Sequence, residues 1–205
     1  TTRFLAIARD GSGRTVGGAE VSWSTANEQV ATVGSTTGLA SAIGNGTTVI
    51  IAEADGVQGS SIFSVAQVVS TVSVQPETRT LTSIGDTMRL VAEALDANRN
   101  PVPNQAWSWE SSNPAVASVS SEGLVTTLDR GTATISAQAG SIDGNAVITV
   151  TQELASVTVS PISASFGALG DTSDLIATAM DAQGNVIPDV GFTWTSSFPS
   201  VAVVD

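Results

Sequence analysis

Short runs of alternating apolar and polar residues, separated by turn residues, make up most of the chain. Residues 71–75 alternate in this way, and the run stops at Pro76. Alternation with a period of two predicts a half-buried strand, and a proline at its end is typical of a strand at a sheet edge. After a Gly-Asp turn signal, residues 90–94 form a second run whose small apolar side chains share one face.

The same pattern continues to residue 152, and no helical period interrupts it. Trp107 and Trp109 share one face of the next predicted strand, after which an Asn-Pro pair breaks the chain. Further short strands are predicted over residues 116–119, 125–128, 133–137 and 146–150. About seven or eight short strands, with a turn signal about every 8–12 residues, are typical of an antiparallel β-sandwich.

This pattern repeats along the chain. Trp23, Trp109 and Trp194 stand 86 and 85 residues apart, and each lies in a similar local sequence. Turn residues keep nearly the same steps, namely Asp10, Asp96 and Asp181, Gly38 and Gly123, Gly46 and Gly131, and Gly85 and Gly170. Self-similarity with a fixed period indicates a tandem array of one domain type.

Three repeats follow from this period, and only the second contains every predicted strand. The predicted divisions are residues 1–67, 68–152 and 153–205. The first repeat lacks its initial strand and the third lacks its C-terminal strands, so we expect the polypeptide to continue with further sandwiches at both ends. Only a few residues join one repeat to the next, without a flexible Gly/Ser-rich or Pro-rich run. These junctions predict a semi-rigid rod.

The second repeat also contains a characteristic series of motifs. In order they read Val-x-Val-x-Pro, Gly-Asp-Thr, Leu-x-Ala-x-Ala-x-Asp, Trp-x-Ser-Ser-Asn-Pro-x-Val-Ala, Gly-Leu-Val and Gly-Thr-Ala-Thr-Ile. This series resembles the bacterial immunoglobulin-like (Ig-like) domain of group 2, the module of invasin- and intimin-like surface proteins. The resemblance implies an all-β fold of tandem Ig-like β-sandwiches arranged end to end. It also implies that Trp23, Trp109 and Trp194 are structural core residues between the sheets.

The composition removes most of the side chains that catalysis uses. The chain contains no His, Cys, Lys or Tyr, and its 7 basic residues are all Arg. It therefore lacks the usual general base, a thiolate nucleophile and a Schiff-base lysine, and it has no disulfide. We predict that the chain is not an enzyme, and that it has no catalytic residues and no cofactor.

The charge balance limits the partners of the chain. Its net charge is −12, with 19 acidic residues, which disfavours nucleic acid and anionic membrane surfaces. No apolar run reaches the roughly 18 residues that a membrane-spanning helix needs. We therefore expect no nucleic-acid partner and no membrane insertion, and an extracellular or cell-surface location.

One loop has the composition of a weak calcium site. Asp96, Asn98 and Asn100 place side-chain oxygens at alternate positions, as a calcium-binding loop does. However, Pro101 stands where such a loop has glycine, and the same residue types form Asx turns in hairpins. The turn is the main interpretation, and calcium binding is the alternative.

These features predict a structural Ig-like repeat segment of a long bacterial surface or secreted protein. It would act as a stalk, spacer or filament in adhesion, and its partners would be further Ig-like repeats or neighbouring copies in a filament. Two alternatives are an Ig-like module that binds a glycan or host protein, and an appendage domain of a phage or virion. The loops are nearly equal in length and do not stand out in aromatic residues or arginine, which favours the spacer.

Overall fold

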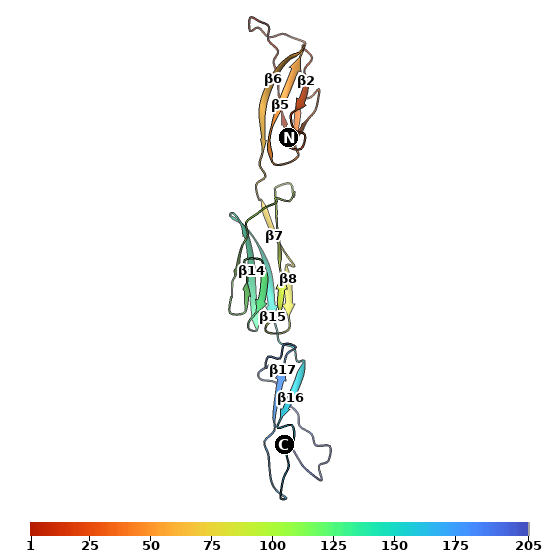
Figure 1. The fold of residues 1–205 in the computed structure, drawn as a ribbon, viewed down its shortest axis with the longest axis vertical. Helices are drawn as coiled ribbons and strands as arrows, with labels where there is room; N and C mark the ends of the chain where they lie inside the picture. The colour runs from red at the N-terminus through yellow and green to blue at the C-terminus, as the bar shows by residue number, and fades with distance from the viewer. Residues whose placement is uncertain (205) are drawn as a thin grey trace. The chain divides into compact units, whose positions relative to one another are not determined.

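The computed structural model describes residues 1–204, and all of the regular elements among them are strands (Figure 1). The chain divides into two compact units, Thr1–Val68 and a unit that begins at Val69. Within the second unit, residues 69–152 form a complete sandwich, and residues 153–204 form a shorter C-terminal segment. The absence of helices among residues 1–204 and the presence of several sheets confirm the predicted all-β fold.

Nine strands build the complete sandwich. They are β7 (Thr71–Gln75), β8 (Thr78–Leu81), β9 (Thr87–Arg89), β10 (Val91–Leu95), β11 (Ser108–Ser111), β12 (Ala117–Val119), β13 (Leu124–Thr127), β14 (Gly131–Ala139) and β15 (Ile142–Val150). One layer is a four-stranded sheet in the order β11-β14-β15-β8. The other layer contains the pair β10-β7 and the sheet β12-β13-β9.

Alternation along each strand directs apolar side chains into the space between these layers. In β15, the inner residues Ala146, Ile148 and Val150 are buried, while the outward-facing Val147 is 38% exposed. The buried cluster between the layers also includes Val74, Leu90, Val125 and Ile135. Burial of this apolar surface is the main force that holds the two layers together.

The path of the first strand differs from the sequence prediction. β7 pairs antiparallel with β10, but after the cis Gln75–Pro76 peptide bond the chain joins the opposite layer. There β8 runs parallel to β15, with Val147 opposite Thr78. The expectation of a purely antiparallel sandwich is therefore wrong for this pair, because polar–apolar alternation does not encode the direction of a neighbouring strand. β7 and β8 follow one another along one side of the sandwich (Figure 1).

The unit Thr1–Val68 repeats part of this arrangement. Its strands are β1 (Thr2–Arg3), β2 (Ser22–Thr25), β3 (Ala31–Val33), β4 (Leu39–Ala42), β5 (Gly46–Ala54) and β6 (Val57–Val65). They form the sheets β2-β5-β6 and β1-β4-β3. The hairpin β5–β6 has the same register as β14–β15, since Gly46 pairs with Val65 as Gly131 pairs with Val150. Residues 4–8, which correspond to Leu90 and the first four residues of β10, form no strand.

The C-terminal segment contains one antiparallel pair, β16 (Ser156–Ser160) and β17 (Ile176–Met180). This pair has the register of β7 and β10, with Val157 opposite Ala179 as Val72 is opposite Ala94. The strand expected around Trp194 does not form. In the complete sandwich the equivalent strand β11 is held by β14, and residues 192–195 have no such partner strand among residues 1–204.

We predict that Ile148→Ala lowers the free energy of unfolding of the complete sandwich by about 2–5 kcal/mol, because it leaves a cavity in a fully buried core position. The neighbouring Val147→Ala on the outer face of the same strand is the control and costs less than about 1 kcal/mol. Hydrogen exchange of the β14 and β15 amides measures the free energy of unfolding of both variants. Equal losses for the two variants would contradict the assignment of the inner face.

Candidate functional site

Asp181 is a buried carboxylate directly after β17, and its side chain is 1% exposed. Its Oδ1 accepts hydrogen bonds from the backbone N–H groups of Gln183 at 3.0 Å and Asn185 at 2.9 Å. The backbone N–H of Gly184 donates to the carbonyl oxygen of Asp181 at 3.1 Å. Gly184 has a φ of 83°, which glycine adopts without steric cost. Residues 181–185 therefore fold around their own aspartate, as an Asx turn does.

The second carboxylate oxygen of Asp181 binds groups from the complete sandwich. Oδ2 accepts hydrogen bonds from the backbone N–H of Ile84 and from Nε2 of Gln152, each at 3.1 Å. Ile84 lies in the turn between β8 and β9, and Gln152 follows soon after the end of β15. Gln152 also donates to the carbonyl oxygen of Val186 at 3.3 Å. One carboxylate therefore joins the C-terminal segment to two parts of the sandwich.

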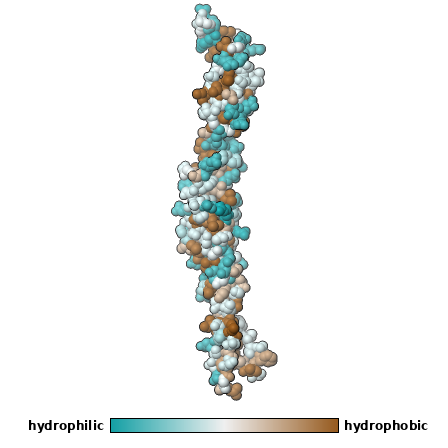
Figure 2. Space-filling model, viewed as in Figure 1, coloured by the Kyte–Doolittle hydropathy of each residue, from teal (hydrophilic) through white to brown (hydrophobic). Residues whose placement is uncertain are grey.

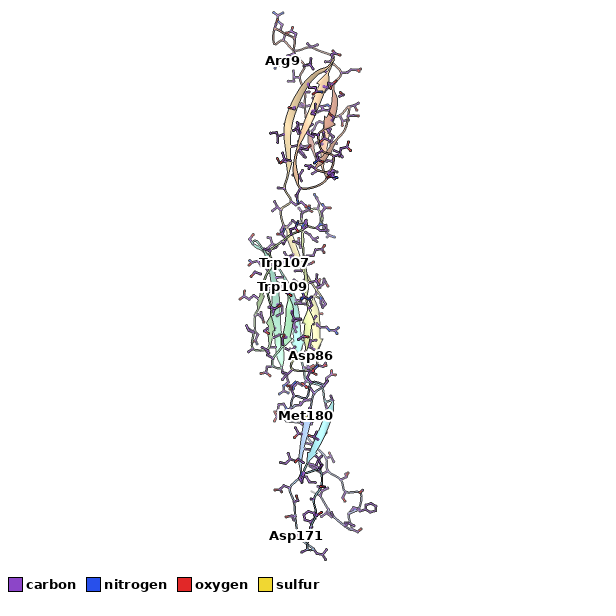
Figure 3. The ribbon with its side chains drawn as sticks, viewed as in Figure 1. Arg9, Asp86, Trp107, Trp109, Asp171 and Met180 are labelled. Atoms are coloured by element: carbon purple, nitrogen blue, oxygen red, sulfur yellow. The ribbon has the colours of Figure 1, made fainter. Side chains whose placement is uncertain are left out.

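Two further side chains of the same loop contact this turn. Nδ2 of Asn185 donates to the carbonyl oxygen of Ile84 at 2.7 Å and to both oxygens of Asp181. Nε2 of Gln183 donates to Oδ1 of Asp86 at 3.0 Å; Figure 3 labels Asp86 and Met180, the residue before Asp181. We refer to Ile84, Asp86, Gln152, Asp181, Gln183 and Asn185 together as the junction clasp.

Hydrogen bonding keeps the Asp181 carboxylate charged although it is buried. Burial alone raises the pKa of this group, because it disfavours the charged form. The hydrogen bonds from the Gln152 side chain, the backbone N–H groups of Asn185 and Ile84, and the Asn185 side chain outweigh that effect. They lower the pKa of Asp181 from 3.8 to about 2.

This environment suits a structural role for Asp181 better than a catalytic one. An efficient general base has a pKa near the working pH, and a carboxylate with a pKa of about 2 accepts protons poorly at neutral pH. Both oxygens of Asp181 are also occupied by N–H donors. The arrangement therefore holds two parts of the chain together through polar contacts.

The loop at Asp96, predicted to be a turn with calcium as an alternative, has the same local geometry. Oδ1 of Asp96 accepts hydrogen bonds from the backbone N–H groups of Asn98 and Asn100, each at 2.9 Å. The Asn100 side chain donates to both carboxylate oxygens at 3.3 and 3.2 Å. Asp10 repeats the turn with the N–H groups of two following residues, Ser12 and Arg14.

The calcium alternative stays a prediction for Asp96, Asn98 and Asn100. Their side chains come together, but N–H donors occupy the Asp96 oxygens that a cation would need. No group of three or more His, Cys, Asp or Glu side chains suited to holding a metal ion occurs among residues 1–204.

The repeated tryptophans lie at equivalent places in the two larger sandwiches. Trp109 is half-buried and packs against the buried cluster of the complete sandwich (Figure 3). A Cβ atom on Gly123 would lie 2.8 Å from its Cζ2 atom, so only glycine leaves room for the indole. Trp23 is also half-buried and lies against Gly38, where a Cβ atom would come within 2.9 Å. Trp194 is half-buried too, but it lies outside any strand.

The sequence analysis identified Asp181 as a repeated turn residue but missed its partners across the junction. One signal was present, because Gln67 and Gln152 stand 85 residues apart, shortly after the last strand of their repeats. No signal pointed to Ile84, since it contributes only backbone groups. Contacts between residues 97 and 101 positions apart, such as those of Ile84 with Asp181 and Asn185, require knowledge of how the repeats are placed.

The complete sandwich matches the sequence model of a known protein family. Residues 68–151 match the sequence model of the family described as bacterial Ig-like domain (group 2). This match confirms the resemblance found in the motifs of the second repeat. A comparison with curated proteins finds no match.

Several bacterial surface proteins are among the solved structures with similar folds. The chain is 18% identical to invasin, described as a bacterial integrin-binding protein, with a TM-score of 0.48 over 90% of this chain and 44% of invasin. For the S-layer protein rSbsC(31-844) the identity is 18% and the TM-score 0.42, over 89% of this chain and 26% of that protein. For FdeC, an Escherichia coli adhesin, the identity is 16% and the TM-score 0.44, over 88% of this chain and 68% of that protein. The chain thus spans about a quarter of the S-layer protein.

None of the described residues belongs to a helix with the length and apolar character needed to cross a membrane.

We predict that acid weakens the junction clasp through Asp181. Because the pKa of this group is lower in the folded chain than its ordinary 3.8, its stabilising contribution is complete above about pH 4. That contribution is lost as the pH falls through about 2. The ¹³C chemical shift of the Asp181 carboxyl group, followed by NMR as a function of pH, should show a midpoint near 2, with faster exchange of the Ile84 amide below it.

Asp181→Asn should remove this pH dependence of the Ile84 amide and weaken the clasp at neutral pH, since an amide cannot replace both acceptor oxygens. Glu153→Gln is the matched control, because it removes one negative charge from an exposed side chain close to the same junction. A titration midpoint for Asp181 at or above pH 4 would show that the hydrogen bonds do not stabilise the charged carboxylate in solution.

Proposed function

We propose that this chain is a structural segment of a long bacterial surface or secreted protein, in which Ig-like repeats act as a stalk, spacer or filament. The junction clasp is the observation that carries the proposal. A spacer transmits position and force only if neighbouring repeats are held in a fixed relation. The clasp supplies such a restraint, because the loop 181–185 bonds to backbone and side-chain groups of the complete sandwich.

The proposal divides the chain into repeats at residues 1–67, 68–152 and 153–205. The shared register of β5–β6 and β14–β15 supports the equivalence of the first two repeats. The shared register of β7–β10 and β16–β17 supports the equivalence of the second and third. Further repeats of the same polypeptide, or neighbouring copies in a filament, are the proposed partners.

The surface of the chain agrees with a water-exposed segment. On the face shown in Figure 2, apolar residues lie in small groups between polar ones. A net charge of −12 makes chains of this kind repel one another and stay apart in solution. The match of residues 68–151 to a bacterial Ig-like family supports the proposed location at the cell surface or outside the cell.

The clasp itself is tested by NMR residual dipolar couplings of the isotopically labelled chain. We predict that couplings from β14–β15 and from β16–β17 fit a single alignment tensor, because the clasp makes the sandwich and the C-terminal segment tumble together. Different tensors for the two pairs in the unchanged protein would contradict a spacer built on fixed junctions.

A double variant, Gln152→Ala with Asn185→Ala, should give different alignment tensors for β14–β15 and β16–β17, while the strands themselves stay intact. Asn145→Ala is the matched control, since Asn145 is an exposed residue of β15 that bonds to Ser136 and Asp143 rather than to the junction. The control should leave a single tensor. Equal behaviour of the double variant and the control would show that another contact fixes the junction.

A further inference from the structure

A pocket of about 200 Å³ opens beside β10 of the complete sandwich. Residues 92–94 of β10, the loop 101–105 and Trp107 line it; Figure 3 labels Trp107. Because β11 begins at Ser108, Trp107 belongs to the loop before this strand and not to the strand itself. Its indole is half-buried, since it packs against the buried cluster and also lines the pocket.

The loop that forms this pocket has the same backbone turn in all three repeats. Asn104 has a φ of 59°, and its equivalents Gly18 and Asp189 have φ values of 77° and 61°. The isolated bridge between Leu95 and Pro101 recurs between Arg9 and Thr15 and between Met180 and Val186. The fold therefore builds this turn with different side chains at the same places.

The side chains that line the pocket are particular to the second repeat. They include one carboxylate, two amides and one indole, from Glu93, Asn104, Gln105 and Trp107. The equivalent residues are Ile7, Gly18, Ala19 and Val21 in the first repeat, and Thr178, Asp189, Val190 and Phe192 in the third. Since the same turn forms without this set, the turn does not require it, and a ligand is the reason we consider for its presence.

The amides beside the pocket keep hydrogen-bonding groups available. Nε2 of Gln105 donates to the carbonyl oxygen of Pro103 at 3.1 Å, which orients this amide and leaves its Oε1 as an acceptor. Asn104 is exposed, and its side chain makes no hydrogen bond among residues 1–204. A primary amide offers both N–H donors and a C=O acceptor. The pocket therefore presents donors and acceptors next to an aromatic surface.

This combination suits a neutral sugar ring. The pocket is smaller than the ~300–1,000 Å³ of sites for drug-sized ligands, so it takes one small ring. The negative face of an indole attracts the C–H groups that cover one face of a pyranose. Hydroxyl groups both donate and accept, as the amides do, whereas a cation would leave the amide N–H donors unused. Glu93 and the net charge of −12 disfavour an acidic sugar.

We propose that this pocket binds a neutral pyranose residue of a glycan. The ring stacks on Trp107, and its hydroxyl groups bond to the side-chain amide of Asn104 and to Oε1 of Gln105. This binding site adds a function to the spacer role, and it does not depend on the junction clasp, because none of the clasp residues lines the pocket.

The experiment uses the polypeptide of residues 1–205, labelled with ¹⁵N and titrated with the methyl glycosides of glucose, galactose, mannose and N-acetylglucosamine. Each of the 4 tryptophans gives its own indole N–H signal in the NMR spectrum. We expect at least one sugar to shift the Trp107 indole signal and the amides of residues 103–107 in a saturable way at millimolar concentration. The indole signals of Trp23, Trp109 and Trp194 should move much less.

Asn104→Gly is the decisive variant. Glycine stands at the equivalent positive-φ position of the first repeat, so the melting temperature should change little. The variant removes the amide, and affinity should fall about three- to tenfold with the lost hydrogen bonds. Trp107→Val, which also places the residue of the first repeat, should weaken binding at least about tenfold because the stacking surface is lost. Gln75→Ala is the matched control, since it removes an exposed amide of β7 outside the pocket and should leave affinity unchanged.

Four results would overturn the proposal. One is the absence of shifts at Trp107 with all of the sugars at millimolar concentration. Another is an equal shift of the Trp23 and Trp194 indole signals, because the sugars would then contact any accessible tryptophan. A third is affinity that Asn104→Gly leaves unchanged. The last is a larger shift of the Trp107 signal with arginine methyl ester than with any of the sugars, which would make the pocket a cation site.

Discussion

A β-strand persists only where a neighbouring strand satisfies its backbone hydrogen-bonding groups, and this requirement decides which parts of the chain are ordered as strands. Buried or half-buried N–H and C=O groups need partners, and in a sheet those partners come from the adjacent strand. β10 pairs with β7, and β17 pairs with β16 in the same register. The segments equivalent to β10 at residues 4–8 and to β11 at residues 192–195 have no such partner among residues 1–204, and neither is a strand.

The junction clasp applies the same requirement to a loop. Asp181 first satisfies the N–H groups of its own turn, as Asp10 and Asp96 do. Its remaining oxygen then accepts a hydrogen bond from the N–H of Ile84, which belongs to the complete sandwich. A turn residue thereby becomes the contact that joins two repeats, and its burial is tolerated because every oxygen has donors.

Much of the complete sandwich was predictable from the sequence, because alternation and turn residues are local signals. The predicted strand at residues 71–75 coincides with β7, and the predicted run at 146–150 lies within β15. The parallel pairing of β8 with β15 was not predictable, since alternation carries no information about strand direction. The repeated Asp181 was visible, but Ile84 takes part through its backbone, which leaves no trace in residue identity.

The same distinction explains why the sequence suggested strands that the structure lacks. Residues 4–8 and 192–195 have the composition of their equivalents in the complete sandwich, so propensity and pattern favour strands there. Strand propensity largely reflects packing against neighbours, and it is weak where those neighbours are missing.

The most direct test of this account is hydrogen exchange of the polypeptide of residues 1–205. Amides of β10 and β17 that face their partner strands should exchange slowly, and amides of residues 5–8 should exchange nearly as fast as those of an unstructured peptide. Equal protection of residues 5–8 and β10 would contradict the central claim, because it would mean that this segment is ordered without the strand that the complete sandwich supplies.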